Sequence, residues 1–311
     1  MMTMSNIANI PELSVVIASF SGAAAVVRCL ESIVPQCEGA GGAEVLAAID
    51  QDAEVVKRLE GRFPSCRFIR APRGTSVFRL RTIGVSEARG KLVALTEDHC
   101  TVSPTWAEAL LKAHREGHAI IGGPVENGLQ ETVYDWALFA CEYLTFLPPL
   151  PDGPAGVLSG VDVAYDRDVL LSVRQTWAQT FHENEVHDAL LAKGQTLHRV
   201  GEAWVKSHLV MPLPQGMSHL FGGAKHYGRY RKTHTPGMKK YLLPMGIPLV
   251  PAVLLWRIFR AVIARRPGRL GTILLGLPYI LCLIGAWTAG EALGYLSCNG
   301  NPRLAEQPQG G

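Results

Sequence analysis

The first 120 residues alternate short apolar runs with longer segments in which apolar residues recur at helical spacing. The run LSVVIAS, for example, contains no charged residue, as expected for a strand that is buried on both faces of a sheet. Strands that alternate with helices in this way form parallel sheets with helices on both sides. We therefore predict an α/β fold, with strands at 13–19, 44–50, 67–72 and 91–97 and helices at 23–34, 53–63 and 76–88.

The pattern changes after about residue 118. Residues 118–210 predict shorter strands and one helix in the segment NEVHDALLAKG, which Gly194 closes. Two long uncharged runs follow, at 241–256 and 273–290. The second is just long enough to span a bilayer. It extends to residue 296 if the one charged residue, Glu291, is included in the apolar segment. The first contains three prolines, which favours a kinked, re-entrant or interfacial segment.

The charge is distributed unevenly. The chain has a formal net charge of only +3, but no Asp or Glu lies between Lys225 and Arg269, a stretch with eleven Lys and Arg. Basic residues beside apolar segments indicate an anionic membrane surface rather than a nucleic acid. Because both flanks of the first apolar run are basic, we expect it to dip into the membrane and return, while the second crosses. A transmembrane hairpin and a buried hairpin of a soluble protein stay open as alternatives.

Cysteines and the N-terminus indicate the compartment. The seven cysteines form no CxxC pair, so we expect neither a disulfide framework nor a zinc knuckle, and a reducing environment fits best. The segment MMTMSNIANIPEL lacks the basic and apolar regions of a signal peptide. We therefore expect an inner-membrane protein whose first domain is cytoplasmic.

Polar side chains cluster where the predicted strands end. Ser19, Asp50 and the triplet Glu97–Asp98–His99 all follow apolar strands, and open α/β sheets bind ligands at this edge. Three adjacent ionisable groups at the end of a buried strand are costly unless a cation meets them. The sequence has neither GxGxxG after its first strand nor GxxxxGK[ST], which disfavours dinucleotide and P-loop enzymes. In HENEVH the two histidines diverge around a helix, so we reject a zinc protease.

Several motifs, in order, resemble those of the family 2 glycosyltransferases, which have the GT-A fold. SVVIASFSGAAAVVRCLESI resembles the opening strand, turn and helix of that family, and AAIDQDAE its second-strand acidic motif. RLRTIGVSEARGKLVALTEDHCTVSPTW is similar to the Arg-Asn-x-Gly helix followed by the Asp-x-Asp strand, GVDVAYDRDVL to a segment of the acceptor half, and FHENEVHDALLAKG to the segment that supplies the base. The resemblance covers residues 13 to about 232.

This resemblance implies roles for individual residues. Glu183, with Glu185 as the second choice, takes the place of the catalytic base. Asp98, His99 and His208 are candidate ligands of Mg²⁺ or Mn²⁺, although Glu-Asp-His departs from Asp-x-Asp. The remaining candidates bind the nucleotide-sugar (Ser19, Asp50 or Asp52, Arg81, Glu97, Asp98 and Asp162) or a phosphate of the diphosphate or acceptor lipid (Arg229 and Arg231). We expect Arg81 to pair with phosphate or to hold the Asp50 loop.

The resemblance and the patterns together predict a membrane-attached, inverting enzyme. We expect a GT-A-like, Rossmann-type, mostly parallel sheet at 1–215, a basic connector at 216–240 and a membrane-associated region at 241–298. Within that region, 241–262 re-enters or spans and 271–296 spans; a polar tail follows at 299–311. The predicted reaction is sugar transfer from a nucleotide-diphosphate donor, UDP-sugar first, to a lipid-linked or envelope polysaccharide acceptor. The alternative is a non-catalytic, membrane-tethered module that binds a nucleotide or a partner.

Overall fold

The structure, a computed structural model, describes residues 10–39 and 42–297. The predicted polar tail lies outside the described residues. The chain divides into two compact units. The sheet unit comprises residues 10–126 and 148–207, and the helical unit comprises residues 127–147 and 208–297. The segment 127–147, which the sequence analysis placed in the GT-A domain, packs with the C-terminal helices instead.

The sheet unit is built on an eight-stranded sheet of order β3-β2-β1-β4-β9-β6-β10-β8. Its first half is parallel and contains β1 (Leu13–Ser19), β2 (Ala43–Ile49), β3 (Cys66–Arg70) and β4 (Leu92–Glu97). The other half, of mixed direction, contains β6 (Ile120–Gly122), β8 (Gly153–Ala155), β9 (Val163–Asp166) and β10 (Leu197–Arg199). A second sheet pairs β5 (Cys100–Val102), β11 (Val205–Ser207) and β7 (Val125–Asn127).

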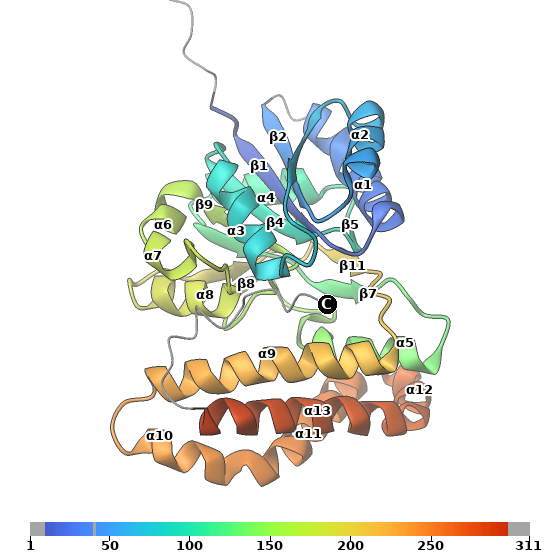
Figure 1. Ribbon diagram of the computed structural model, residues 1–311, viewed down its shortest axis with the longest axis vertical. Coiled ribbons are helices and arrows are strands. Elements are labelled where there is room, and N and C mark those ends of the chain that lie inside the picture. Colours follow the sequence, from blue (N-terminus) through green and yellow to red (C-terminus); the bar gives the residue numbers. More distant parts are fainter. Residues whose placement is uncertain (1–9, 40–41, 298–311) are drawn as a thin grey trace, which may run out of the picture. The chain divides into compact units, whose positions relative to one another are not determined.

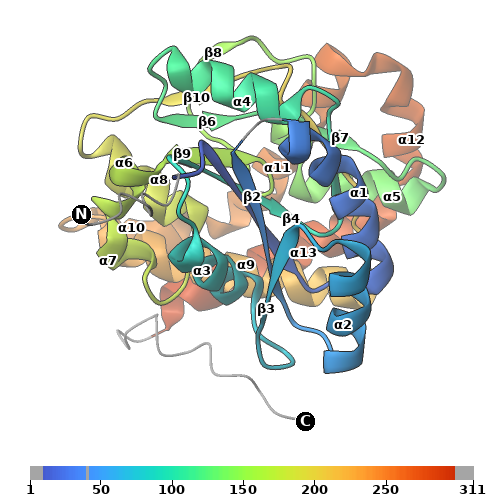
Figure 2. The same cartoon turned by 90° about the horizontal axis from the view of Figure 1, so that it is seen from above.

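Helices connect these strands, as the blue, teal and yellow-green segments of Figures 1 and 2 show. They are α1 (Ala23–Gly39), α2 (Ala53–Arg62), α3 (Val77–Glu87), α4 (Trp106–Arg115), α6 (Arg167–Leu171), α7 (Arg174–Trp177) and α8 (Glu183–Leu191). The four early strands and three early helices are those predicted, although α1 continues past the predicted end, through Pro35. The α/β fold with a mostly parallel first half is confirmed.

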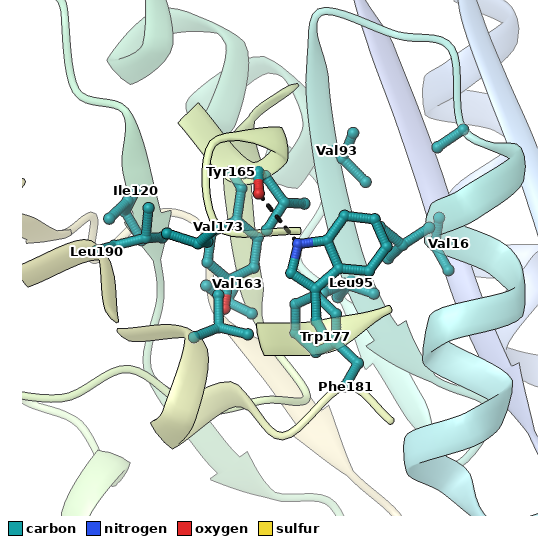
Figure 3. Close-up of a cluster of buried hydrophobic side chains, with 14 of the residues drawn as sticks. Val16, Val93, Leu95, Ile120, Val163, Tyr165, Val173, Trp177, Phe181 and Leu190 are labelled. Atoms are coloured by element: carbon teal, nitrogen blue, oxygen red, sulfur yellow. Dashed lines mark hydrogen bonds between the residues drawn. The ribbon is translucent and has the colours of Figure 1, made fainter. Parts of the chain in front are cut away.

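One hydrophobic core fixes α8 beneath the sheet. Side chains from β1, β4 and β9 meet those of the segment that leads into α8, and Figure 3 shows Trp177 and Phe181 beside Tyr165. All three aromatic side chains are fully buried. This packing matters for function because the first residue of α8 is Glu183.

The helical unit consists of helices around a small apolar cluster. Its elements are α5 (Val133–Glu142), η1 (Leu144–Phe146), α9 (Leu213–His234), α10 (Lys239–Leu242), η2 (Leu243–Leu249), α11 (Val250–Arg265), η3 (Pro267–Arg269), α12 (Leu270–Leu275) and α13 (Leu277–Leu296). Leu138, Leu220 and Leu283 form its buried centre. Two helical stretches among the described residues, Lys239–Arg265 and Leu277–Leu296, are long and apolar enough to cross a membrane.

The helices α9 and α13 pack closely through glycines. A Cβ at Gly290 would lie 2.3 Å from the carbonyl oxygen of Phe221, and one at Gly294 would lie 2.4 Å from that of Lys225. Such contacts exclude any larger side chain at these two positions and let the backbones approach each other. Nearer the start of both helices, Gly216 faces the side chain of Leu283. Residue numbers therefore rise together along the interface, which means that the two helices are parallel.

Candidate active site

Asp98 is anchored at the carboxyl end of β4, beside the end of β1. Its Oδ2 accepts hydrogen bonds from the Ser19 hydroxyl, at 2.9 Å, and from the Ser21 backbone N–H, at 2.7 Å. Its other oxygen, Oδ1, is buried and has no hydrogen-bond partner. Burial raises the pKa of the Asp98 carboxyl, against the hydrogen bonds from Ser21 and Ser19 that lower it. A buried carboxylate oxygen without a donor is costly, and a cation would relieve that cost.

Asp50 belongs to the same edge. Its backbone N–H donates to the carbonyl of Ser19, so the loop after β2 is tied to the end of β1. The carboxylate of Asp50 accepts from the Gly74 N–H at 2.9 Å and pairs with Arg73 at 3.2 Å. Arg73 therefore holds this loop, which was one of the two roles expected of Arg81; the other, a contact of Arg81 with phosphate, stays a prediction. The neighbouring Asp52 is exposed and is the N-cap residue directly before α2.

Arg81 joins two carboxylates that come from distant parts of the sequence. One Nη donates to Glu97 Oε1 at 2.5 Å and the other to Glu183 Oε2 at 2.7 Å. The side chains of Arg81 and Glu97 are buried, and that of Glu183 is 22% exposed. Burial by itself would raise the pKa of Glu183, but the Arg81 guanidinium holds it below the ordinary value. Glu183 is thus kept as a carboxylate.

Gly160 allows the acceptor-half segment to pass over this ion pair. A Cβ at Gly160 would lie 2.8 Å from both Nη2 of Arg81 and Cδ of Glu183. Two residues later, Asp162 is fully buried and accepts from Trp106 Nε1 at 2.9 Å and from the Gly123 N–H at 3.0 Å. Both carboxylate oxygens of Asp162 are therefore bonded to other parts of the protein. Its contact with the nucleotide-sugar stays a prediction.

The residues beside Asp98 complete the strand-end group. The ring of His99 meets Phe20 edge-on, with centroids 6.1 Å apart, and its Nδ1 lies 3.4 Å from Glu97 Oε2. No group of three or more His, Cys, Asp or Glu side chains in residues 10–39 and 42–297 is placed to hold a metal ion. A metal that bridges two phosphates needs only one or two protein ligands, however, because the substrate supplies the others. The unpartnered Oδ1 of Asp98 fits such a site.

Other predicted residues lie elsewhere. Glu185 is half-buried in the first turn of α8, two residues after Glu183. His208, Arg229 and Arg231 belong to the helical unit, where the His208 ring packs against Gly128 and Arg231 pairs with Glu291. The structure thus brings together Ser19, Asp50, Asp98 and His99 at the strand ends and Arg81, Glu97 and Glu183 in one ion-pair group, and the contact between His99 and Glu97 links the two groups. The sequence analysis did not predict Ser21, Arg73 or the Arg81–Glu183 pair. Gly160, in the segment GVDVAYDRDVL, was the one signal of a close approach near that pair.

Comparison with known proteins identifies the fold. Residues 14–171 match the family described as Glycosyl transferase family 2. The chain is 33% identical, over 142 residues, to polypeptide N-acetylgalactosaminyltransferase 12 of Mus musculus, a match that covers 44% of this chain and 23% of that relative. The chain therefore spans only about a quarter of the length of this relative.

Solved structures agree with the family match. A mannosyltransferase of Pyrobaculum calidifontis in complex with GDP-Man and Mn²⁺ superposes with a TM-score of 0.54 at 13% identity, covering 92% of this chain and 87% of that one. GalNAc-T7 with UDP, GalNAc and Mn²⁺ gives 0.51 at 14% identity, covering 74% and 52%. The predicted GT-A fold and the predicted family are confirmed.

Proposed function

Since this chain belongs to glycosyl transferase family 2, we propose that it moves a sugar from a nucleotide-diphosphate donor, with inversion, to a hydroxyl of a lipid-linked or envelope saccharide. The observation that carries the proposal is the joining of three strand ends around Asp98. Ser19 bonds to the Asp98 carboxylate, and the Asp50 loop bonds to the Ser19 carbonyl. The carboxyl ends of β1, β2 and β4 thereby form one polar edge, where open α/β sheets bind nucleotides.

The proposed donor is a UDP-sugar. UDP is the nucleotide named in the GalNAc-T7 complex, and GDP-Man, named in the other structure, is the second choice. Asp50 is the proposed partner of the base edge, because it lies at the end of β2 in a loop fixed by Arg73. A divalent ion, Mg²⁺ or Mn²⁺, would be held by Asp98 with His99 and would neutralise charge that builds on the leaving diphosphate.

Glu183 is the proposed base. In an inverting transfer the acceptor oxygen attacks the anomeric carbon while the bond to the diphosphate breaks, and the electron pair of that bond leaves with the diphosphate. The acceptor proton passes to a carboxylate within hydrogen-bond reach. Arg81 keeps Glu183 ionised and fixes its position, and the 22% exposure of the Glu183 side chain leaves it open to an acceptor. Glu185 is the fallback base.

A donor panel tests this proposal. Full-length protein in detergent is incubated with UDP- and GDP-sugars and Mn²⁺, and release of the nucleotide diphosphate is measured for the wild type, Glu183→Gln and Glu185→Gln. Asp188→Asn, exposed on the same helix, is the matched control. We expect turnover that Glu183→Gln lowers by roughly 100-fold or more, since general-base catalysis contributes about that much.

Two results would contradict the proposal. Undiminished turnover in Glu183→Gln would remove the base assignment. Nucleotide binding without turnover of any donor, in the presence of candidate saccharide acceptors, would instead favour a non-catalytic binding module.

A further inference from the structure

The helical unit exposes an unusual share of apolar side chains. Of the eighteen large apolar side chains that are exposed in the part of the chain that the structure describes, fourteen lie between Met238 and Leu296. On α11 they form a single face, with Val253, Trp256 and Ile263 spaced three and seven residues apart. Arg260 lies on that face too, and its guanidinium sits 5.2 Å above the Trp256 ring. A helix face of this kind is typical of the boundary between lipid headgroups and acyl chains.

Length alone would let α13 cross a bilayer. Its 20 residues extend about 30 Å, which matches the hydrocarbon core. Its packing partner is the parallel helix α9, and the two are in contact from Gly216 at one end to Gly294 at the other. The pair lies side by side in Figure 1. If α13 spanned a membrane with this packing intact, α9 would have to span it as well.

The composition of α9 argues against such a span. The segment LPQGMSHLFGGAKHYGRYRKTH contains four Lys and Arg, and Lys225 and Arg229 lie well inside the helix. Gln215, Ser218 and His219 are exposed on the half that the basic residues do not occupy. Charged side chains at membrane depth are rare and face a bundle interior or a water-filled cavity. A helix that exposes polar and basic side chains along its whole length, and buries apolar ones such as Leu220 on its other side, lies at the surface of a membrane instead.

Both ends of the helical unit are basic. At the end where α9 and α13 begin, Arg265 donates to the carbonyls of Leu144, Thr145 and Leu147, and Arg269 stacks on Trp136. At the opposite end, the Lys232 ammonium donates to the Ser297 carbonyl, and Lys239 and Lys240 follow α9. A bundle that crossed the bilayer would have to translocate one of these groups, which the positive-inside bias opposes.

We infer that the helical unit lies flat on an anionic bilayer surface, with both of its ends on the same side. The apolar face of α11 enters the headgroup–acyl boundary, and the basic groups at the two ends contact lipid phosphates. This arrangement replaces the expectation that 271–296 crosses the membrane. Charge complementarity selects the lipid surface as the occupant, because the exposed apolar face lies within a stretch, Lys225 to Arg269, that has no acidic residue.

Flotation with vesicles tests the lipid specificity. Full-length protein is added to preformed phosphatidylcholine vesicles with or without phosphatidylglycerol. We expect binding that requires phosphatidylglycerol and that Lys239→Glu/Lys240→Glu weakens roughly tenfold or more, since each basic residue near the surface contributes about 1 kcal/mol. The matched control is Lys57→Glu/Arg58→Glu, two adjacent exposed residues of α2. Equal binding to both vesicle types, or equal weakening by both variants, would overturn the inference.

Labelling of cysteines tests the topology. In protein with Cys141, Cys282 and Cys298 changed to serine, the four remaining cysteines are buried (Cys29, Cys37, Cys66 and Cys100), and one accessible cysteine at a time is added by Gly268→Cys at one end or by Met238→Cys or Ser297→Cys at the other. A membrane-impermeant maleimide is then added outside the sealed anionic vesicles. We expect all three sites to react fully without detergent. Protection of the sites at one end until detergent is added would establish a span and would sink the inference, whether or not the enzyme transfers sugar.

Discussion

Each unit of this protein buries a glutamate beside an arginine, and the two pairs differ in how the charge is satisfied. In the sheet unit, Arg81 is 5% exposed and serves both Glu97 and Glu183. In the helical unit, Arg231 is 41% exposed and lies 3.3 Å from Glu291. The carboxylate of Glu291 is satisfied mainly by neutral donors, since it accepts hydrogen bonds from Trp287 and Tyr295.

This difference indicates that the Arg81 pair belongs to a functional site and that the Glu291 pair has a structural role. Two carboxylates around one buried guanidinium leave an excess negative charge, which is costly for stability and typical of functional positions. A carboxylate with two neutral donors and a half-exposed arginine is an ordinary way to satisfy a buried acid between packed helices. The Arg81 group should therefore affect both folding and activity when changed, whereas the Glu291 group should affect folding alone.

The largest effect is expected from Arg81→Gln. This change leaves Glu97 and Glu183 without their shared cation, and breaking a buried ion pair in this way costs about 3–5 kcal/mol. Unfolding by denaturant and donor turnover are both measured, and both should fall. Arg79→Gln, on the same helix, is the control, because the Arg79 guanidinium donates to the Gln179 carbonyl and not to a carboxylate. Comparable losses in the two variants would show that the Arg81 group is not special.

A smaller effect is expected from Gly160→Ala. The added methyl group would lie closer to Arg81 and Glu183 than their van der Waals radii allow, so these side chains must shift. Overpacking of this kind costs about 1–3 kcal/mol. Because the displaced groups include the proposed base, turnover should fall more than stability predicts. Gly156→Ala, where a Cβ meets nothing within 4 Å, is the control. Wild-type turnover in Gly160→Ala would contradict the tight placement of Glu183.

Glu291→Gln should be milder still. The amide group of glutamine turns one acceptor into a donor opposite Trp287 or Tyr295, so about one hydrogen bond, worth roughly 1–2 kcal/mol, is lost. Thermal unfolding should register this loss while turnover per folded molecule is unchanged. Glu60→Gln, at an exposed position of α2, is the control. A drop in turnover per folded molecule would remove the contrast between the two pairs.

The smallest effect concerns the protonation of Glu183, which changes activity only well below neutral pH. Arg81 holds the pKa of Glu183 below its ordinary value of 4.5, against burial, which alone raises it. A base must be ionised, so activity should persist at pH 4.5 and be lost only as pH falls through the lowered pKa. The stabilising contribution of this carboxylate is likewise present above 4.5 and is lost over the same acid range. In Arg81→Gln the acid limb should move upward; an unchanged limb would mean that Glu183 is not the titrating base.

The sequence predicted the first half of the sheet unit well because each strand there is a short, uninterrupted apolar run. It also predicted that Ser19, Asp50 and Asp98 meet, since they end neighbouring parallel strands. It could not predict the Arg81–Glu183 pair, whose members are 102 residues apart and are brought together only by the packing of α8 on β9. Nor could it predict that residues 127–147 belong to the helical unit. It also could not predict that α9 and α13 pack side by side and in parallel, because their closest contacts are made by glycines, which leave no hydrophobic periodicity in the sequence.

The account depends most on the proposal that Asp98 binds a divalent metal ion, which in turn binds the diphosphate of the nucleotide. Isothermal titration of the full-length protein in detergent with UDP and GDP, with and without Mn²⁺, measures this directly for the wild type, Asp98→Asn and the control Asp188→Asn. We predict nucleotide binding that requires Mn²⁺, is lost in Asp98→Asn and is retained in Asp188→Asn. Binding that is indifferent to Mn²⁺ and survives Asp98→Asn would contradict the account.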